Sequence, residues 1–542
     1  MKNFFTLFFI SLITSTAFAQ HITHGPVTGA LTDSSARIYI RTSQATTCTL
    51  LIANDSLGNI VQQIPGNTLP ELDSSHIFDI AGLDPFTYYY ISFIINGHLD
   101  SIHGRFRTNP EPGKPSVLTF VTGSCQESEN MKTFDIMNAL QPHMLIHTGD
   151  FTYPSYQMND DYPQLYSAVQ ESYRRRYQEK RMREMLRTVP IAYINDDDDG
   201  WGASRYKGLS YTRYTTVGEK KKIVNYMKTD TFPQLHRDNC FRAYREYFPG
   251  YAVPESQDGL YHTFTVGNCQ FIFLDTRNTA DCNADQFTFD SLSMKWRFDP
   301  KPENHLISTA QMSWLKKELL ASKADWKFLV CGLPFNKNIR TLIDLGIKMQ
   351  DLVVAGAGEK GTGFRLAASF ATYWAGFPND QQEVLKFIAD NKIKDVLVIS
   401  GDTHHNVMDD GQNAGLPELN ASGLAVAGTH LAYYMNLLCK LSNYPSLKKA
   451  MWNGGGGGIK NKNFKNQFGK IDVIGKEKVI MSVVDEDGIT ISKMEIPHSS
   501  TVEYKGPKKI MPYQKRLDNK FGKKPGGWLL FEKSLAKLIW KP

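Results

Sequence analysis

Cysteine is scarce in this chain, with seven among 542 residues. So few cysteines do not make a disulfide scaffold, and a composition of 41% hydrophobic and 21% charged residues is too ordinary for a disordered or collagen-like protein. We also find no internal repeats. The length is sufficient for a sizeable core, and a folded protein of two or more domains is expected.

A strong excess of one charge is also lacking, since 61 basic and 55 acidic residues leave a formal net charge of +6. The Lys-rich C-terminal tail, residues 496–542, can account for this excess by itself. We therefore interpret the tail as a solvated surface and expect no specific nucleic-acid partner.

Long apolar runs are lacking beyond the N-terminus. There, Met1-Lys2 precedes an apolar run over 4–13, and Ala17-Phe18-Ala19 supplies small residues before Gln20. This order is typical of a secretory signal peptide, residues 1–19, cleaved after Ala19. A transmembrane anchor would need about 20 apolar residues, more than this run has. We expect an exported protein, periplasmic or extracellular, with no membrane span after cleavage; the oligomeric state is left open.

Residues 20–108 alternate apolar and polar side chains in short segments separated by turn residues. This pattern predicts an all-β sandwich of the Ig/FnIII type. The predicted strands include 36–41, 47–52, 76–80 and 88–93.

A Pro-rich segment, 108–115, is the best domain boundary in the sequence. From 116 to 495 apolar strands alternate with helices, which predicts an α/β layered domain. A capping box formed by Ser308 and Gln311 opens a helix to 320, and 166–187 is expected to be one long, charged, solvated helix. The predicted strands are 116–122, 144–147, 190–194, 269–274, 327–331 and 395–400.

Most of these strands end in a cluster of potential metal ligands. Such clusters converge in the crevice at the carboxyl edge of an open α/β sheet. Taken alone, each has a plainer interpretation: a turn, an inert core thiol or an acidic surface loop. Five in succession predict a metal site; they contain Cys125, Asp150 with Tyr153, Asp196 with Asp197, Arg277, and Asp402 with His404.

The ligand types fall into two sets. A thiolate, a phenolate and an imidazole, from Cys125, Tyr153 and His404, suit a transition metal, and the phenolate favours ferric iron. Asp196 and Asp402 are hard oxygen ligands that suit calcium or another divalent ion. Asp150 lies between the sets and could bridge two ions, which would clamp a phosphoryl group.

These motifs resemble the alkaline phosphatase D family of the metallophosphoesterase superfamily. The resemblance covers roughly residues 22–492, including the segment Leu83–Tyr90 of the sandwich. It is carried by Gly-Ser-Cys125-Gln, His147-Thr-Gly-Asp150-Phe-Thr-Tyr153, Phe273-Leu-Asp-Thr-Arg277, Gln311-Met-Ser-Trp-Leu315, Trp374-Ala-Gly-Phe-Pro378, Ile399-Ser-Gly-Asp-Thr-His404, Glu418-Leu-Asn-Ala-Ser-Gly-Leu424 and Asn466-Gln-Phe-Gly469.

The resemblance implies the four-layer αββα sandwich of metallophosphoesterases and hydrolysis of phosphate mono- or diesters by a metal-bound hydroxide. It places Fe³⁺ on Cys125, Asp150, Tyr153 and His404, and Ca²⁺ or another divalent ion on Asp150, Asp196 and Asp402. Arg277 would neutralise charge on the phosphoryl oxygens, or would form an ordinary structural ion pair.

One departure from the family pattern concerns the leaving group. Where the family has a histidine, this chain has Asp197. An aspartic acid would replace it as general acid only with a pKa well above about 4. The loss of a general acid typically costs roughly 10²–10⁴-fold in rate, and least for good leaving groups such as aryl phosphates.

Two other functions stay open at this point. A weakly active or inactive relative would bind a phosphorylated ligand or a glycan at the cell surface. A diesterase acting on phospholipid or teichoic-acid-like polymers is a third hypothesis, because the basic tail and the 12% of aromatic residues could support polyanion binding.

Iron on Cys125 would also resolve the odd number of cysteines. Six cysteines then remain, an even number. Among these six we expect Cys269 and Cys331 to be buried free thiols. Cys240 and Cys282 are the first pair to test for a disulfide, and the other two cysteines are Cys48 and Cys439.

Overall fold

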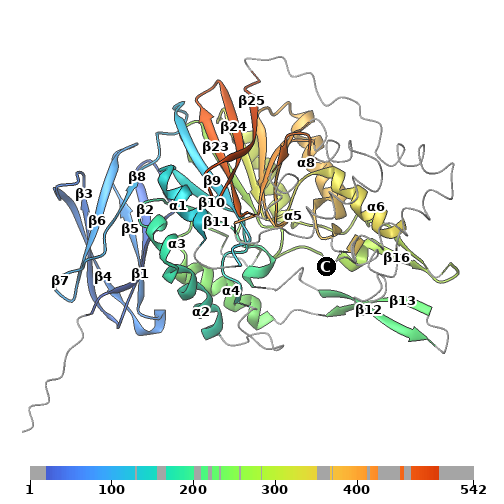
Figure 1. The fold of residues 1–542 in the computed structure, drawn as a ribbon, viewed down its shortest axis with the longest axis horizontal. Coiled ribbons are helices and arrows are strands. Elements are labelled where there is room, and N and C mark those ends of the chain that lie inside the picture. The colour runs from blue at the N-terminus through green and yellow to red at the C-terminus, as the bar shows by residue number, and fades with distance from the viewer. Residues whose placement is uncertain are drawn as a thin grey trace, which may run out of the picture.

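The structure is a computed structural model (Figure 1). It describes residues 20–499 apart from 128–130, 155–165, 201–208, 218–221, 231–233, 255–257, 282, 294, 349, 351–366, 369, 412–414, 425–451 and 457–464. The predicted signal peptide and nearly all of the predicted tail lie outside the described residues. None of the helices within the described ranges is long and apolar enough to cross a bilayer.

The N-terminal region is the predicted β-sandwich, coloured blue in Figure 1. One antiparallel sheet has the order β1-β2-β5, and the other has the order β4-β3-β6-β7 with β8 paired to β6. The strands are β1 (Ile22–Gly29), β2 (Ser35–Thr42), β3 (Thr46–Ala53), β4 (Ile60–Thr68), β5 (Ser75–Ala81), β6 (Tyr88–Ile95), β7 (His98–Leu99) and β8 (Gly104–Arg107).

The first central sheet has six strands in the order β11-β10-β9-β23-β24-β25. The strands β9, β10 and β11 are parallel, so their carboxyl ends lie at one edge, and the rest of the sheet is antiparallel. The strands are β9 (Val117–Gly123), β10 (Met144–His147), β11 (Ile191–Tyr193), β23 (Gln467–Ile474), β24 (Lys478–Asp485) and β25 (Thr490–Pro497).

The second central sheet has seven strands in the order β14-β15-β18-β19-β21-β20-β22. Its parallel centre, from β15 to β21, again brings carboxyl ends to one edge. The strands are β14 (His262–Val266), β15 (Cys269–Leu274), β18 (Trp326–Cys331), β19 (Val396–Ser400), β20 (Asn406–Asp410), β21 (Pro417–Ala421) and β22 (Gly455–Gly456).

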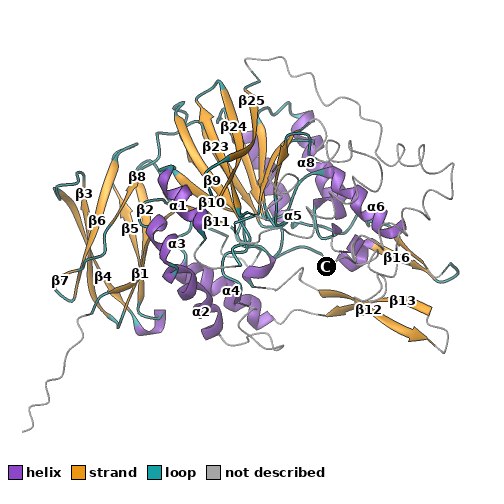
Figure 2. Cartoon of the chain, viewed as in Figure 1, coloured by secondary structure: helices purple, strands orange, loops and turns teal. Residues whose placement is uncertain are grey.

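Helices cover the outer faces of both sheets, and Figure 2 shows the two sheets between them. The first group covers the sheet that contains β9 and also faces the sandwich: α1 (Lys132–Ala139), α2 (Tyr166–Gln178), α3 (Lys180–Leu186) and α4 (Gln234–Tyr247). The second group covers the sheet that contains β15: α5 (Thr309–Ala321), α6 (Arg340–Lys348) and α8 (Pro378–Asp390). The predicted four-layer αββα arrangement is therefore present.

Two hairpins complete the described strands. They are β12 (Leu209–Val217) with β13 (Lys222–Asp230), and β16 (Phe287–Asp290) with β17 (Lys295–Phe298).

The strands of the second sheet are apolar on both faces and divide their side chains between two cores. Phe271 and Phe273 of β15 point into a core shared with the first sheet, whereas Ile272 and Leu274 point toward the outer helices. This follows from the two-residue period of a strand, and it explains why these segments read as uninterrupted apolar runs. The core between the sheets also continues into the sandwich, through residues such as Tyr39.

The predicted long, charged helix over 166–187 is wrong in its continuity and in its exposure. The chain breaks at Glu179 into α2 and α3, and Arg176 is fully buried with its guanidinium 2.6 Å from Glu179. A charge pattern alone did not reveal this, because a buried ion pair and a solvated one use the same residue types.

The predicted helix after Ser308 is present as α5, and the Ser308 hydroxyl accepts the Gln311 amide at 3.1 Å. The reciprocal half of the capping box is wrong. The Gln311 side chain instead pairs with the backbone of Asp275, accepting its N–H at 2.8 Å and donating to its carbonyl at 2.9 Å. The start of α5 thus fixes the loop after β15.

The predicted buried thiols Cys269 and Cys331 are confirmed, and both lie on central strands. Cys282 and Cys439 lie outside the described residues, so the pairing of Cys240 with Cys282 stays a prediction.

A buried carboxyl group, Glu418 on β21, joins two neighbouring strand ends. Its Oε1 accepts the Phe335 N–H at 2.7 Å and the Ser400 hydroxyl at 2.6 Å, while Oε2 makes no hydrogen bond within the described ranges. Complete burial raises the pKa of Glu418 from 4.5 to about 8, despite these hydrogen bonds. The side chain is therefore neutral at neutral pH in the folded protein.

We expect Glu418→Gln to remove a pH dependence of stability. Between about 4.5 and about 8 the folded chain keeps the Glu418 proton and the unfolded chain releases it, so the wild-type free energy of unfolding falls as pH rises, by roughly 1.4 kcal/mol per pH unit from this group. The variant should lack this slope. Urea unfolding at pH 5, 6.5 and 8 measures the difference, with exposed Glu477→Gln as the control. Parallel pH profiles for wild type and Glu418→Gln would contradict the assignment.

Candidate metal centre

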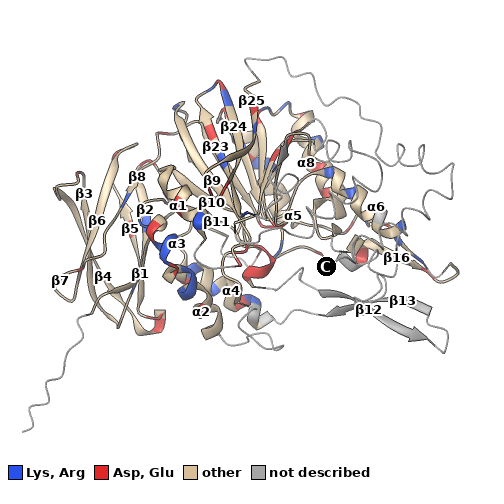
Figure 3. Ribbon diagram, viewed as in Figure 1, with Lys and Arg blue, Asp and Glu red and all other residues tan. Residues whose placement is uncertain are grey.

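The carboxyl ends of five parallel strands bring the sequence-predicted site residues together. Cys125 follows β9, Asp150 and Tyr153 follow β10, and the acidic run at 196–199 follows β11. Arg277 follows β15 in the second sheet, and Asp402 and His404 follow β19. Figure 3 shows the acidic turn η3 (Asp197–Asp199) in red at the lower end of the central strands.

The first group of potential ligands combines sulfur, nitrogen and oxygen. One ligand atom each from Cys125, Asp150 and His404 lies within 4.8 Å of the others. Cys125 Sγ is 3.3 Å from Asp150 Oδ2, close enough for the thiol to donate a hydrogen bond to the carboxylate. Burial raises the pKa of this thiol, and the neighbouring carboxylates Asp150 and Asp402 raise it further.

The second group consists of carboxylates alone. Oxygens of Asp150, Asp196, Asp197 and Asp402 lie within 4.8 Å of one another, so Asp150 belongs to both groups, as the bridging hypothesis requires. The presence of Asp197 in this group was not anticipated, because the sequence assigned it to the leaving group rather than to the second ion.

Tyr153 lies in the same loop as Asp150 and is buried. Burial raises the pKa of its hydroxyl well above the ordinary value, and the charges of Asp150 and Cys125 raise it further. The Arg176 guanidinium carbon lies 5.6 Å from the centre of its ring.

Most of the predicted ligands share an uncommon backbone conformation. The left-handed region is sparsely populated by residues other than glycine, and such conformations gather at functional sites. Here five of the six predicted metal ligands have it: Cys125 (φ 61°), Asp150 (φ 56°), Tyr153 (φ 53°), Asp402 (φ 65°) and His404 (φ 55°). Four of these residues, all except Tyr153, belong to the two ligand groups described above.

Arg277 is the cation that faces the second group. Its guanidinium forms an ion pair through Nε with Asp196, and its second terminal nitrogen lies 3.6 Å from Asp197 and 3.3 Å from Asp402. The side chain is buried. One guanidinium thus faces three carboxylates, and its role toward a substrate stays a prediction.

The electrostatics of the second group favour an additional cation. Burial and the other carboxylates raise the pKa of Asp196 well above its ordinary value, although Arg277 opposes the shift, and the pKa of Asp402 rises to about 6. Asp196 Oδ2 is buried and makes no hydrogen bond within the described part of the chain. Hard anionic oxygens held this close suit a divalent cation, so the residues present fit the second ion implied by the sequence.

Close packing holds Asp196 against two glycines. A side chain at Gly149 would collide with Asp196 Cβ, and one at Gly332 would meet the Asp196 carboxylate at 2.5 Å. Gly149 also has a φ of 110°, which only glycine adopts readily.

Asp199 organises the loops and was missed by sequence reasoning. Its carboxylate accepts backbone N–H groups of Asp150 (2.7 Å), Phe151 (2.7 Å), Thr152 (2.9 Å) and Asp196 (2.9 Å). The loop after β10 is therefore closed on the loop after β11. Four adjacent aspartates look alike in a sequence, so no local signal distinguishes this one.

A second set of unpredicted residues holds the loop that carries Asp402 and His404. The Asn420 side chain donates to the Gly401 carbonyl at 2.7 Å, and the Ser422 hydroxyl accepts the His405 N–H at 3.2 Å. Burial raises the pKa of the Tyr373 hydroxyl well above its ordinary value, and the charge of Asp402 raises it further. Asn420 and Ser422 belong to the motif 418–424. Their hydrogen bonds to Gly401 and His405 give that motif a physical role, which is to hold the loop after β19.

Comparison with known proteins gives consistent results. The PhoD-like phosphatase family matches residues 120–429, which is more than half of the chain. Alkaline phosphatase D of Bacillus subtilis (strain 168) is 26% identical over 353 residues, covering 62% of this chain and 54% of that protein. The chain thus spans about half the length of this curated relative.

A solved structure of PhoD has the same fold, with a TM-score of 0.59 at 18% identity, covering 94% of this chain and 97% of that one. Such a distant likeness shows the fold alone. The family match, however, contains the loops after β9, β10, β11, β15 and β19, and so contains every residue of both ligand groups. The chain therefore belongs to the PhoD-like phosphatase family.

Proposed function

We propose that the chain is a metal-dependent phosphoesterase that hydrolyses phosphate mono- or diesters. The observation that carries the proposal is the pair of ligand groups sharing Asp150, one with mixed donors and one with oxygen donors only. Two cations a few ångströms apart are a recurring device for phosphoryl transfer. The N-terminal sequence supports the further proposal that the protein is exported, to the periplasm or the outside of the cell.

The donor types assign the ions. Ferric iron would take Cys125, Asp150, Tyr153 and His404, and calcium or another divalent ion would take Asp150, Asp196 and Asp402. When bound, such ions polarise a phosphoryl group and lower the pKa of a water molecule.

The chain's own residues position these ligands and balance their charge. Asp199 holds the Asp150 loop through backbone amides, so the bridging carboxylate is placed before any substrate arrives. We propose that Arg277 keeps the carboxylates of the second group together and directs its remaining positive charge toward phosphoryl oxygens.

Asp197 has a different role from the histidine that it replaces. Its carboxylate lies with those of Asp150, Asp196 and Asp402, and Arg277 is 3.6 Å away. We propose that it contributes a further oxygen to the second cation, which leaves the departing group without a strong proton donor. This favours substrates with good leaving groups, such as aryl phosphates.

We expect Asp150→Asn to reduce aryl phosphatase kcat/KM by at least about 100-fold, because both ions lose a shared ligand. Asparagine tolerates the left-handed backbone at this position, so the fold should persist. The control is Asp395→Asn, which has the same positive φ (56°) but lies at the opposite, amino end of β19. Equal activity of Asp150→Asn and wild type would refute the assignment of the activity to this metal site, and an inactive wild type would favour a binding function.

Visible absorption tests Tyr153 as an iron ligand. A phenolate bound to ferric iron should give the protein a charge-transfer band that Tyr153→Phe removes, with iron content measured on the same samples. Tyr373→Phe, which alters a tyrosine beside Asp402, should keep the band. A band that persists in Tyr153→Phe would show that another residue supplies the phenolate.

Two substitutions at Asp197 separate the proposed roles. Asp197→Asn should weaken calcium binding about 10-fold or more by isothermal titration, whereas Asp198→Asn, the same charge change on a neighbour outside the ligand group, should weaken it less. Asp197→His should raise kcat/KM for alkyl phosphates more than for aryl phosphates, because imidazole can protonate the leaving group. Unchanged calcium affinity in Asp197→Asn would exclude the ligand role.

A further inference from the structure

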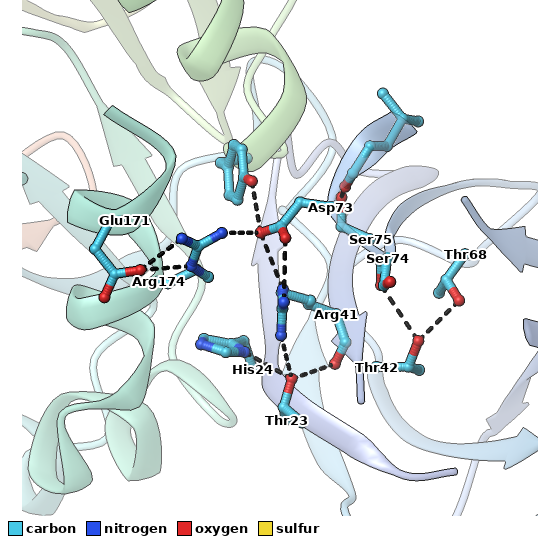
Figure 4. Close-up of polar contacts among 12 residues, drawn as sticks. Thr23, His24, Arg41, Thr42, Thr68, Asp73, Ser74, Ser75, Glu171 and Arg174 are labelled. Carbon is cyan, nitrogen blue, oxygen red and sulfur yellow. Dashed lines mark hydrogen bonds and ion pairs between the residues drawn. The ribbon is translucent and has the colours of Figure 1, made fainter. Parts of the chain in front are cut away.

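One of the contacts between the N-terminal sandwich and the α/β region centres on the carboxylate of Asp73 (Figure 4). Asp73 follows a short turn between β4 and β5 and has a φ of 56°. It accepts two hydrogen bonds from Arg41 of β2, with N–O distances of 3.0 and 3.1 Å. It also accepts hydrogen bonds from Arg174 of α2 and from the hydroxyl of Tyr247 at the end of α4, both at 2.7 Å.

The ion pairs of Asp73 are partly buried, unlike an ordinary surface ion pair. Burial alone would raise the pKa of Asp73, but hydrogen bonds from Arg41, Arg174 and Tyr247 hold it below its ordinary range. The Asp73 and Arg174 side chains are 17% and 22% exposed. Without Asp73, the two guanidinium groups would face each other, although Arg174 would keep its ion pair with Glu171.

Aromatic rings reinforce the same contact. Tyr39 of β2 packs against Tyr177 of α2 with ring centres 5.2 Å apart, and Tyr173 of α2 stacks on Tyr247 at 5.4 Å. The Tyr177 hydroxyl donates to the Tyr247 carbonyl at 3.0 Å. Helix α2 is thus fixed by the sandwich on one side and by α4 on the other.

Helix α2 also holds the loop at 150–153, through Arg176 and Tyr177. Residues 174 and 176 lie about 200° apart around the helix, at 100° per residue. Arg176 donates through Nε to the Phe151 carbonyl at 2.5 Å, and the Phe151 ring lies 6.0 Å from the ring of Tyr177. Helix α2 therefore contacts both the backbone and the side chain of the residue that follows Asp150.

A second connection runs from α2 to Asp150 itself. Glu179, the partner of Arg176, accepts a hydrogen bond from the Gln126 side chain at 3.3 Å. The backbone N–H of Gln126 donates to the Asp150 carbonyl at 2.9 Å. All four of these residues are buried, so water does not compete for the hydrogen bonds.

We propose that Asp73 is a positioning residue for the metal-binding loop at 150–153, acting through helix α2. The N-terminal sandwich is then part of the catalytic apparatus rather than an appended module. This inference rests on the proposed function, since it concerns the same site. It goes beyond that function because it assigns the position of the loop at 150–153 partly to a residue outside the α/β layers.

The test compares two Asp-to-Asn changes within the sandwich. Asp73→Asn removes the charge while keeping a residue type that tolerates the left-handed backbone. Asp79→Asn is the matched control, because Asp79 pairs with Arg37 in the same sheet but its side chain is 76% exposed.

The main readout is hydrogen exchange of the amides of Asp150, Phe151 and Thr152, which donate to Asp199. We expect Asp73→Asn to speed their exchange about tenfold, and Asp79→Asn to leave it unchanged. Amides of the β23–β24 pair serve as the internal reference and should not change. A loss of overall stability would instead speed exchange in both regions together.

Kinetics give the second readout. With an aryl phosphate, Asp73→Asn should lower kcat with little change in KM, because the loop holds ligands rather than substrate. Arg174→Met should reproduce both effects, and the double variant should add little to either single change, since the two residues act through one contact. If Asp73→Asn does not fold, Tyr247→Phe removes a single hydrogen bond from the same carboxylate and should show a smaller effect of the same kind.

The outcomes distinguish this inference from the proposed function. Unchanged protection of residues 150–152 in folded Asp73→Asn and Arg174→Met would overturn the inference, whatever the activity. A wild type inactive on all phosphoesters, whose loop still loses protection in Asp73→Asn, would overturn the proposed function and leave the positioning role intact.

Discussion

The burial of several carboxyl groups at one edge of two sheets is the constraint on which the rest of the structure depends. Asp150, Asp196, Asp197 and Asp199 are each at most 4% exposed, and an isolated buried carboxylate is costly. The protein compensates in two ways. Arg277 supplies one positive charge to the second ligand group, and four backbone N–H groups converge on Asp199. The negative charge that remains is carried by carboxylate oxygens that lie close enough together to hold a metal ion.

The two compensations serve different ends. The amides around Asp199 are fixed by the chain and always present, so this carboxylate is structural. Asp196 accepts a hydrogen bond from Arg277 through Oδ1, whereas its Oδ2 makes no hydrogen bond in the described part of the chain. Oδ2 therefore remains available to a cation. Five of the predicted ligands have a left-handed backbone conformation. Such conformations persist only where the surrounding structure holds them in place. Rigid sheets and the amides on Asp199 provide those surroundings.

Much of the fold could be predicted, and so could the gathering of potential ligands at the strand ends, because both depend on local patterns. Strands such as β10 and β15 are uninterrupted apolar runs of strand length, and potential ligands follow them at once. The remaining features depend on contacts between distant segments. Gln311 looks like half of a capping box until Asp275 is beside it, and Arg176 looks solvated until Phe151 and Glu179 surround it. Asp199 differs from its three neighbours only in which amides it faces.

The division into domains shows the same limit of local patterns. The Pro-rich segment at 108–115 marks a change of secondary structure, yet the hydrophobic core continues from Tyr39 in the sandwich to Tyr177 and Phe151 beside the ligands. The segment at which the composition of the chain changes is therefore not a boundary of the hydrophobic core. Helix α2 contacts both the sandwich and the loop at 150–153, through Arg174 and Arg176 respectively. The position of the loop at 150–153, at the edge of the central sheets, therefore also depends on the packing of the sandwich against α2.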